Sequence, residues 1–164
     1  MPRPELSAEL TTPDRWWWGI AITSLATLLI VSVVGYAEVP ATIPLHFGAD
    51  GWPDQYGSRW IYWMFPLLGC LLLGLFWWML GRTHRFSYPF QITQENAALQ
   101  YRTAAAFLLL QASIILVALT YIQFTLIRSA QEGAGGLGAW FVPALTVAVI
   151  GTTVGYLFLA NKRA

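Results

Sequence analysis

Four long apolar runs constrain this chain more than any other feature of its sequence. They cover residues 16–36, 60–80, 103–127 and 140–159, and a helix needs about 20 such residues to cross a hydrocarbon core of about 30 Å. Hydrophobic residues make up 57% of the chain and charged residues only 10%, against roughly 25% charged in an ordinary soluble domain. The sequence therefore predicts an all-α integral membrane protein that is surrounded by the lipid bilayer.

The third helix is predicted to begin before its apolar run. In the segment ITQENAALQYR, Thr93 stands where a helix N-cap would lie, and Glu95 follows in the first turn, where a negative charge favours the helix dipole. One four-helix membrane domain over residues 1–164 follows, with helices at about 16–36, 60–80, 94–127 and 140–159. Its connections are an outer loop at 37–59, an inner segment at 81–102 and a glycine-rich stretch at 129–138 that predicts a flexible hinge.

Basic residues predict the orientation, because short loops rich in Lys and Arg stay on the cytoplasmic side. With both termini cytoplasmic, seven of the nine basic residues are inside and only Arg59 and Arg128 are outside. Tryptophans at the ends of the runs suit an interfacial belt. We expect a multi-pass protein of a prokaryotic inner membrane. A net charge of +1, without a clustered basic face, argues against nucleic acid as a partner.

Two of the helices carry signs of contact with protein rather than with lipid. In the fourth, a stripe of small side chains predicts close packing on another helix, in this bundle or in a partner subunit: Ala144, Ala148, Gly151 and Gly155. In the third, Ser113 and Thr120 lie seven residues apart on one face with Gln123 beside them, while Gln111 faces away. We expect these polar groups to bond neighbouring helices.

Catalytic signatures are missing from the sequence. It contains no phosphate-binding glycine loop, no H-E-x-x-H zinc motif and no G-x-S-x-G nucleophile motif. Its single cysteine, Cys70, lies in an apolar run, where a small buried hydrophobe is the stronger interpretation. We therefore expect a protein that is not an enzyme and that holds no cofactor.

The loop IPLHFGADGWPDQYGS, residues 43–58, carries an unusual amount of turn chemistry. Its prolines and glycines predict a compact loop, since Pro holds extended backbone and Gly permits positive φ. The apolar side chains at alternate or nearly alternate positions are expected to cover the mouth of the bundle: Ile43, Leu45, Phe47, Trp52 and Tyr56. The polar residues are expected to face water or bond the loop's own amides: His46, Asp50, Asp54 and Ser58.

Two interpretations of the loop's polar residues remain open. Asp54 and Ser58 could cap the start of the second helix, and His46 and Asp54 could bond loop amides or each other. Alternatively, His46, Asp50 and Asp54 step by four and could converge on a divalent cation. One imidazole and two carboxylates are a weak ligand set for zinc, so we expect no metal.

Two motifs in this chain resemble those of a known family. I-P-x-H-F followed by G-x-P-D-x-x-G-S, and then YPFQITQENAALQYR, resemble a small membrane domain of unknown function in bacterial and archaeal proteins and in the N-terminal part of SdpI-type immunity proteins. The match covers roughly residues 20–125 and carries over to Pro44, His46, Phe47, Gly51, Pro53, Asp54, Ser58, Tyr88, Pro89, Ile92, Thr93, Glu95, Asn96, Gln100 and Tyr101. Gly48 departs from the asparagine usual in that family, so any ligand role of that amide is lost.

Three functions remain open at this point. The resemblance implies a binding or signalling protein that uses the outer loop to recognise an extracellular peptide and the inner segment to engage a regulator; the chain is too short to add a further multi-helix immunity module. Nine tryptophans and the small-residue stripe suit an accessory subunit with a protein partner in the membrane. An enzyme or transporter using His46 and Asp54 is the least favoured, because few other residues could complete a site.

Overall fold

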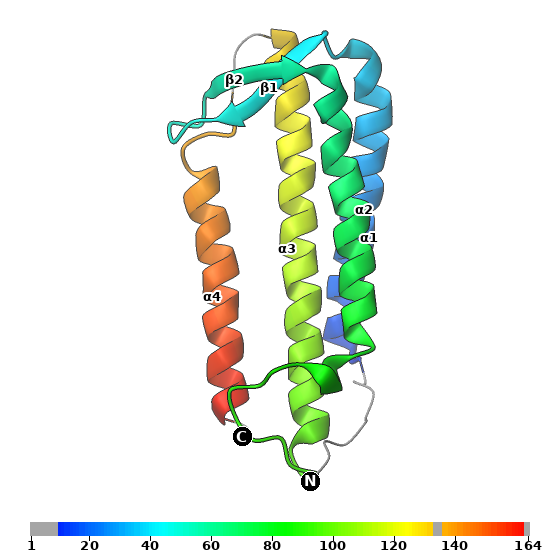
Figure 1. The fold of residues 1–164 in the computed structure, drawn as a ribbon, viewed down its shortest axis with the longest axis vertical. Helices are drawn as coiled ribbons and strands as arrows, with labels where there is room; N and C mark the ends of the chain where they lie inside the picture. The colour runs from blue at the N-terminus through cyan, green and yellow to red at the C-terminus, as the bar shows by residue number, and fades with distance from the viewer. Residues whose placement is uncertain (1–9, 133–135, 163–164) are drawn as a thin grey trace.

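The computed structural model describes residues 10–132 and 136–162. Four helices run up and down beside one another, and a small hairpin lies across one end of the bundle (Figure 1). The helices are α1 (Thr12–Gly35), α2 (Met64–Leu80), α3 (Ala97–Glu132) and α4 (Phe141–Lys162), and the strands are β1 (Thr42–Phe47) and β2 (Pro53–Ser58). Short 3-10 turns flank them: η1 (Tyr36–Glu38), η2 (Arg59–Trp63) and η3 (Thr83–Arg85).

All four helical stretches are long and apolar enough to cross a membrane: Thr12–Glu38, Arg59–Leu80, Ala97–Gln131 and Phe141–Lys162. The start of α1 and the end of α4 lie at the same end of the bundle, opposite the hairpin (Figure 1). The fold is therefore that of a multi-pass membrane protein.

The helix boundaries differ from the expected ones for local chemical reasons. α1 begins about a turn early because Asp14 Oδ2 accepts hydrogen bonds from the backbone N–H and the hydroxyl of Thr11, at 2.6 and 2.5 Å. Regular α2 begins only at Met64, after η2; Pro66 has no N–H with which to continue an α-helical ladder through the preceding turn. α3 continues to Glu132, beyond the expected end at 127.

The start of α3 confirms Thr93 as its cap. The backbone N–H of Ala97 donates to Thr93 O at 3.1 Å. Thr93 Oγ1 accepts from the Asn96 N–H at 3.2 Å, and Asn96 Oδ1 accepts from the Thr93 N–H at 2.9 Å. This is a reciprocal cap in which Asn96 takes the place usually held by Glu or Gln.

The compact loop expected between α1 and α2 contains a two-stranded sheet, which the all-α prediction did not include. β1 and β2 form an antiparallel pair, with Thr42 opposite Ser58 and Phe47 opposite Pro53. The register shifts on both sides of His46, so the ladder contains an irregularity beside that residue. Asp54 and Ser58 lie in β2, and neither side chain caps the helical turns that follow, which removes the capping interpretation.

α3 is the central helix of the fold. Its buried side chains Ala112, Leu116 and Leu119 pack with Ala21 and Leu28 of α1, and side chains of α2 close the cluster. α4 packs on α3 and stands apart from α2 (Figure 1). The bundle is therefore a packed group of three helices with α4 attached to one side of α3.

Candidate recognition site

One face of the hairpin is fixed to the bundle. Ile43 is fully buried in a cluster with Val39, Tyr62 and Leu126. Phe47 packs against a second cluster that includes Leu137 and Phe141. Ile43 and Phe47 thus contact the bundle mouth as expected. These contacts hold β1 firmly on the end of the helices.

The other apolar side chains of the loop are not at the bundle mouth, which corrects the expectation for Leu45, Trp52 and Tyr56. Their side chains are exposed, Trp52 by 55% and Tyr56 by 61%. Period-two alternation could not foresee this, because the register shifts beside His46 and the turn between the strands changes which face each later residue occupies.

The turn between the strands rests on the connection that leads into α4. The Gly48 N–H donates to Trp52 O at 2.8 Å, and Asp50 Oδ1 accepts from the Trp52 N–H at 3.1 Å. Gly51 has φ of +81°, and a Cβ atom there would meet the backbone of Gly138 at 2.5 Å. A Cβ atom on Gly136 would meet Gly51 O at 1.8 Å.

This glycine contact corrects the flexible hinge expected at 129–138. Residues 129–132 extend α3, and 136–138 pack against the hairpin turn; 133–135 lie outside the described residues. Three glycines allow the two backbones to approach at a distance that no larger residue permits. The connection therefore links the hairpin to the start of α4.

His46 and Asp54 form a pair on the exposed side of the hairpin. The distance from His46 Nδ1 to Asp54 Oδ1 is 2.6 Å, and the side chains are 62% and 53% exposed. Of the two arrangements expected, bonds to loop amides or to each other, the structure has the second. Asp50 and Ser58 are exposed as well.

A metal site is not formed by these residues. Within the described part of the chain, no group of three His, Cys, Asp or Glu side chains is placed to hold an ion. Gly48 lies beside both carboxylates: a Cβ atom there would be 3.0 Å from Asp50 Oδ1 and 3.5 Å from Asp54 Oδ2. A side chain at this position, such as the asparagine usual in the similar family, would contact both groups.

The exposed face of the hairpin combines apolar and polar side chains, and the helix bundle holds the hairpin in place. Leu45, Trp52 and Tyr56 offer apolar and aromatic area, and the His46–Asp54 pair offers polar groups. Each strand is paired along one edge only, within the described two-stranded sheet. Such a surface can bind a partner through side chains or through an added strand, and nothing in its geometry resembles a nucleophile with its base.

The polar side chains of α3 form hydrogen bonds with two neighbouring helices. Ser113 Oγ donates to Trp17 O at 2.7 Å, and Thr120 Oγ1 donates to Ser24 O at 3.0 Å, so both bond α1 as expected. Gln111 does face away from them, where its Nε2 donates to Thr153 Oγ1 of α4 at 3.2 Å. The sequence did not assign that second contact.

Gln123 behaves differently from Ser113 and Thr120. It is fully buried and its amide interacts with the Tyr62 side chain, yet neither Nε2 nor Oε1 has a partner at full hydrogen-bond geometry among the described residues. The Tyr62 hydroxyl instead donates to Ser32 O at 2.9 Å. Gln123 therefore reaches the neighbouring η2 turn at Tyr62, but without a hydrogen bond of regular geometry.

The two glycines of the small-residue stripe on α4 have no close neighbour within the described chain. A Cβ atom added at Gly151 or Gly155 would meet no atom within 4 Å. Ala144 and Ala148 line a cavity between α1, α3 and α4, and Gly155 lines another. The two glycines of the stripe therefore have no close neighbour within the described chain, and packing of the stripe on another helix stays a prediction.

The second sequence motif, YPFQITQENAALQYR, lies at the end of the bundle opposite the hairpin. The Tyr88 hydroxyl donates to Thr83 O at 2.9 Å, and its ring lies 6.0 Å from that of Tyr101. Gln100, fully buried, donates from Nε2 to Ala160 O at 2.9 Å. These contacts attach the inner segment and the end of α4 to the start of α3.

The fold and the hairpin define a small multi-pass membrane protein with a structured connection between its first two spans. A family model described as "Domain of unknown function (DUF1648)" matches residues 23–70, from the middle of α1 through the hairpin into α2. The match thus includes the first of the two sequence motifs, and the motif around Tyr88 lies beyond it.

The description of a relative of similar sequence names no function. An uncharacterized protein from Archaeoglobus fulgidus is 42% identical over 50 residues, which are 30% of this chain and 27% of that protein. The chain therefore spans about a quarter of the length of the curated relative it matches. No solved structure matches.

Proposed function

We propose that this protein is a non-catalytic membrane protein that binds an extracytoplasmic partner, of peptide character, through the β1–β2 hairpin. The observation that carries the proposal is the division of the hairpin into two faces. Ile43 and Phe47 fix it to the bundle, while Trp52 and Tyr56 are left in the open. Aromatic side chains on a rigid support are typical of binding hot spots, because little conformational entropy is lost on contact.

The proposal includes an orientation and a mode of binding. Both termini are cytoplasmic and the hairpin is outside a prokaryotic inner membrane, in accord with the bias of basic residues. An extended peptide can bond the unpaired edge of a strand, and Trp52, Tyr56 and the His46–Asp54 pair can then contact its side chains. Resemblance to SdpI-type proteins, which bind an extracellular peptide, supports this choice.

A photo-crosslinking experiment tests the proposal. A photoreactive phenylalanine analogue replaces Tyr56 in one variant and Trp16 in a second, since both side chains are exposed. Tyr56 is in β2 and Trp16 is near the start of α1, and these elements lie at opposite ends of the bundle (Figure 1). We expect a discrete peptide or protein adduct from position 56 only, which weakens on Trp52→Ala. Adducts to lipid alone at position 56 would overturn the proposal.

A second candidate function, an accessory subunit of a membrane complex, is favoured by the open face of α4. Gly151 and Gly155 of its small-residue stripe have no described atom within 4 Å of an added Cβ atom, and such stripes commonly pack on other helices. Purification from native membranes in mild detergent distinguishes the two. A fixed set of co-purifying subunits that Gly151→Leu dissociates would favour the accessory-subunit function. A protein that purifies alone would favour partner binding through the hairpin.

A further inference from the structure

The structure has an apolar groove on the side where α1 and α4 are separated. Two cavities of about 330 and 370 Å³ lie along α3 in this position, and Trp17 lines both. Along α3 they extend from Arg102 to Tyr121, roughly 28 Å at 1.5 Å per residue. That length is about the thickness of the hydrocarbon core.

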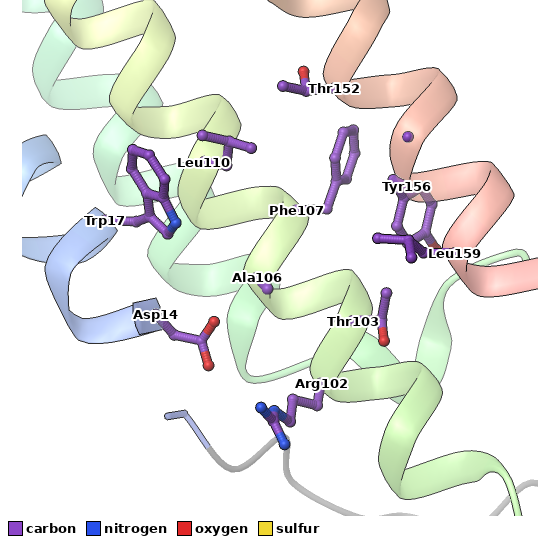
Figure 2. A pocket seen from close by; sticks show the side chains of 11 residues that line it. Asp14, Trp17, Arg102, Thr103, Ala106, Phe107, Leu110, Thr152, Tyr156 and Leu159 are labelled. Atoms are coloured by element: carbon purple, nitrogen blue, oxygen red, sulfur yellow. The ribbon is translucent and has the colours of Figure 1, made fainter. Parts of the chain in front are cut away.

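The walls of the groove are suited to an acyl chain. Leu110, Ile114 and Val117 of α3 line its floor, and Leu145 and Leu159 line the α4 side. Near one end the rings of Phe107 and Tyr156 are stacked with centroids 4.6 Å apart (Figure 2). Apolar surface of this kind is filled by lipid chains or by protein, since water gains nothing there.

The two ends of the groove differ in polarity. Trp140 and Tyr121 line the end near the hairpin. At the other end Asp14 and Arg102 line the same cavity (Figure 2). Asp14 is only 4% exposed and its Oδ2 accepts the two hydrogen bonds from Thr11. Arg102 is exposed, and neither residue forms an ion pair with another described residue. A carboxylate and a guanidinium therefore stand together where the start of α1 would meet the lipid headgroups.

This pair of opposite charges distinguishes between the possible occupants. A transmembrane helix in the groove would not in itself offer two opposite charges at one end. An anionic phospholipid would suit Arg102 but would bring its negative charge beside Asp14. A phospholipid whose headgroup carries both a phosphate and a primary ammonium group matches both residues.

We propose that the groove is a binding site for an aminophospholipid, with one acyl chain along α3, the phosphate at Arg102 and the ammonium group at Asp14. The choice rests on charge complementarity at the polar end and on an apolar groove that runs the depth of the hydrocarbon core, so that an acyl chain of one leaflet fills the half that begins at Arg102. A quaternary ammonium headgroup carries the same charge but cannot donate a hydrogen bond to the carboxylate. The site is separate from the hairpin and would operate whatever the hairpin binds.

Native mass spectrometry of the full chain tests the site. The protein is equilibrated with vesicles of equal parts phosphatidylethanolamine, phosphatidylglycerol and phosphatidylcholine, extracted in mild detergent and analysed for retained lipid. We expect about one phosphatidylethanolamine per chain, with the other two lipids depleted. Arg102→Gln should weaken retention about tenfold, while Arg85→Gln, at an exposed residue that lines neither cavity, should leave it unchanged.

A pair of glycine substitutions tests the acyl-chain part of the groove. Gly155 lines the cavity and Gly151 lines neither one, yet each has open space around a new Cβ atom, so both variants should fold. We expect Gly155→Leu to abolish retention of phosphatidylethanolamine and Gly151→Leu to preserve it. Equal retention of all three lipids, no effect of Gly155→Leu, or a protein subunit in the groove that Gly155→Leu displaces would each overturn the proposal.

Discussion

Ser113 Oγ, in the middle of α3, lies 2.7 Å from the carbonyl oxygen of Trp17 on α1. Seven residues further along both helices, Thr120 repeats the contact with Ser24 O at 3.0 Å. The two helices are therefore parallel and held in one register by two bonds of the same kind. The hairpin follows α1 and leads through α2 to α3. The register between α1 and α3 therefore also sets where the hairpin lies above them.

Thr120→Val should lower the stability of the bundle by about 0.5–1.5 kcal/mol, because it removes a bond between helices while preserving shape. Thermal unfolding in detergent measures the effect. Thr27→Val is the control, since Thr27 bonds only Thr23 O of its own helix, at 2.9 Å, on an exposed face. Equal shifts in the two variants would show that the contact with Ser24 contributes nothing.

Gly51→Ala should loosen the hairpin from α4. The residue has φ of +81°, and the new Cβ atom would lie 2.5 Å from the backbone of Gly138, so we expect destabilisation by more than about 1 kcal/mol. Gly19→Ala is the matched control, because it lies in α1 with no atom within 4 Å of the added carbon. That change should be neutral or slightly stabilising. Protease sensitivity of the loop reports the outcome, and no difference between the variants would contradict the glycine contact.

Gln123→Met should leave stability unchanged or raise it by about 1 kcal/mol, since an apolar side chain of similar length relieves two buried polar atoms without partners. Gln111→Met should lower stability, because it removes the bond to Thr153. Melting temperatures of the two variants settle the comparison. A clear loss in Gln123→Met would mean that its amide has a partner in the membrane.

His46→Gln and Asp54→Asn should each lower the melting temperature by a few degrees at most, because exposed ion pairs contribute about 0–1 kcal/mol. Elemental analysis of the purified protein should find metal near zero in the wild type and in both variants. About one zinc ion per chain, lost in His46→Gln, would instead make the hairpin a metal site.

Single cysteines placed in a Cys70→Ala background test the orientation. Ser58 at the end of β2 and Ser87 between η3 and α3 are both exposed. The hairpin and the segment between η3 and α3 lie at opposite ends of the bundle (Figure 1). We expect an impermeant thiol reagent to label Ser58→Cys in intact cells and Ser87→Cys only after the cells are opened. The reverse pattern would invert the orientation.

The length of the apolar runs predicted the four helices because such a run has few alternatives in a bilayer. Thr93 was predictable as a cap for a similarly local reason. The hairpin was not, since Pro44 and Pro53 obscured the strands and only pairing between distant residues creates the ladder. The contact of Gly51 with Gly136 and Gly138 had no sequence signal beyond the glycines themselves.

Four of the bonds that hold the bundle together share a feature that affects how the sequences of such chains diverge. The acceptors of Ser113, Thr120, Gln100 and Tyr62 are all main-chain carbonyl oxygens, of Trp17, Ser24, Ala160 and Ser32. Every amino acid supplies that acceptor, so the receiving helix can change its side chains without losing the bond. Pairs of co-varying residues would therefore not reveal these contacts in relatives, whereas the donor positions on α3 and η2 would remain polar.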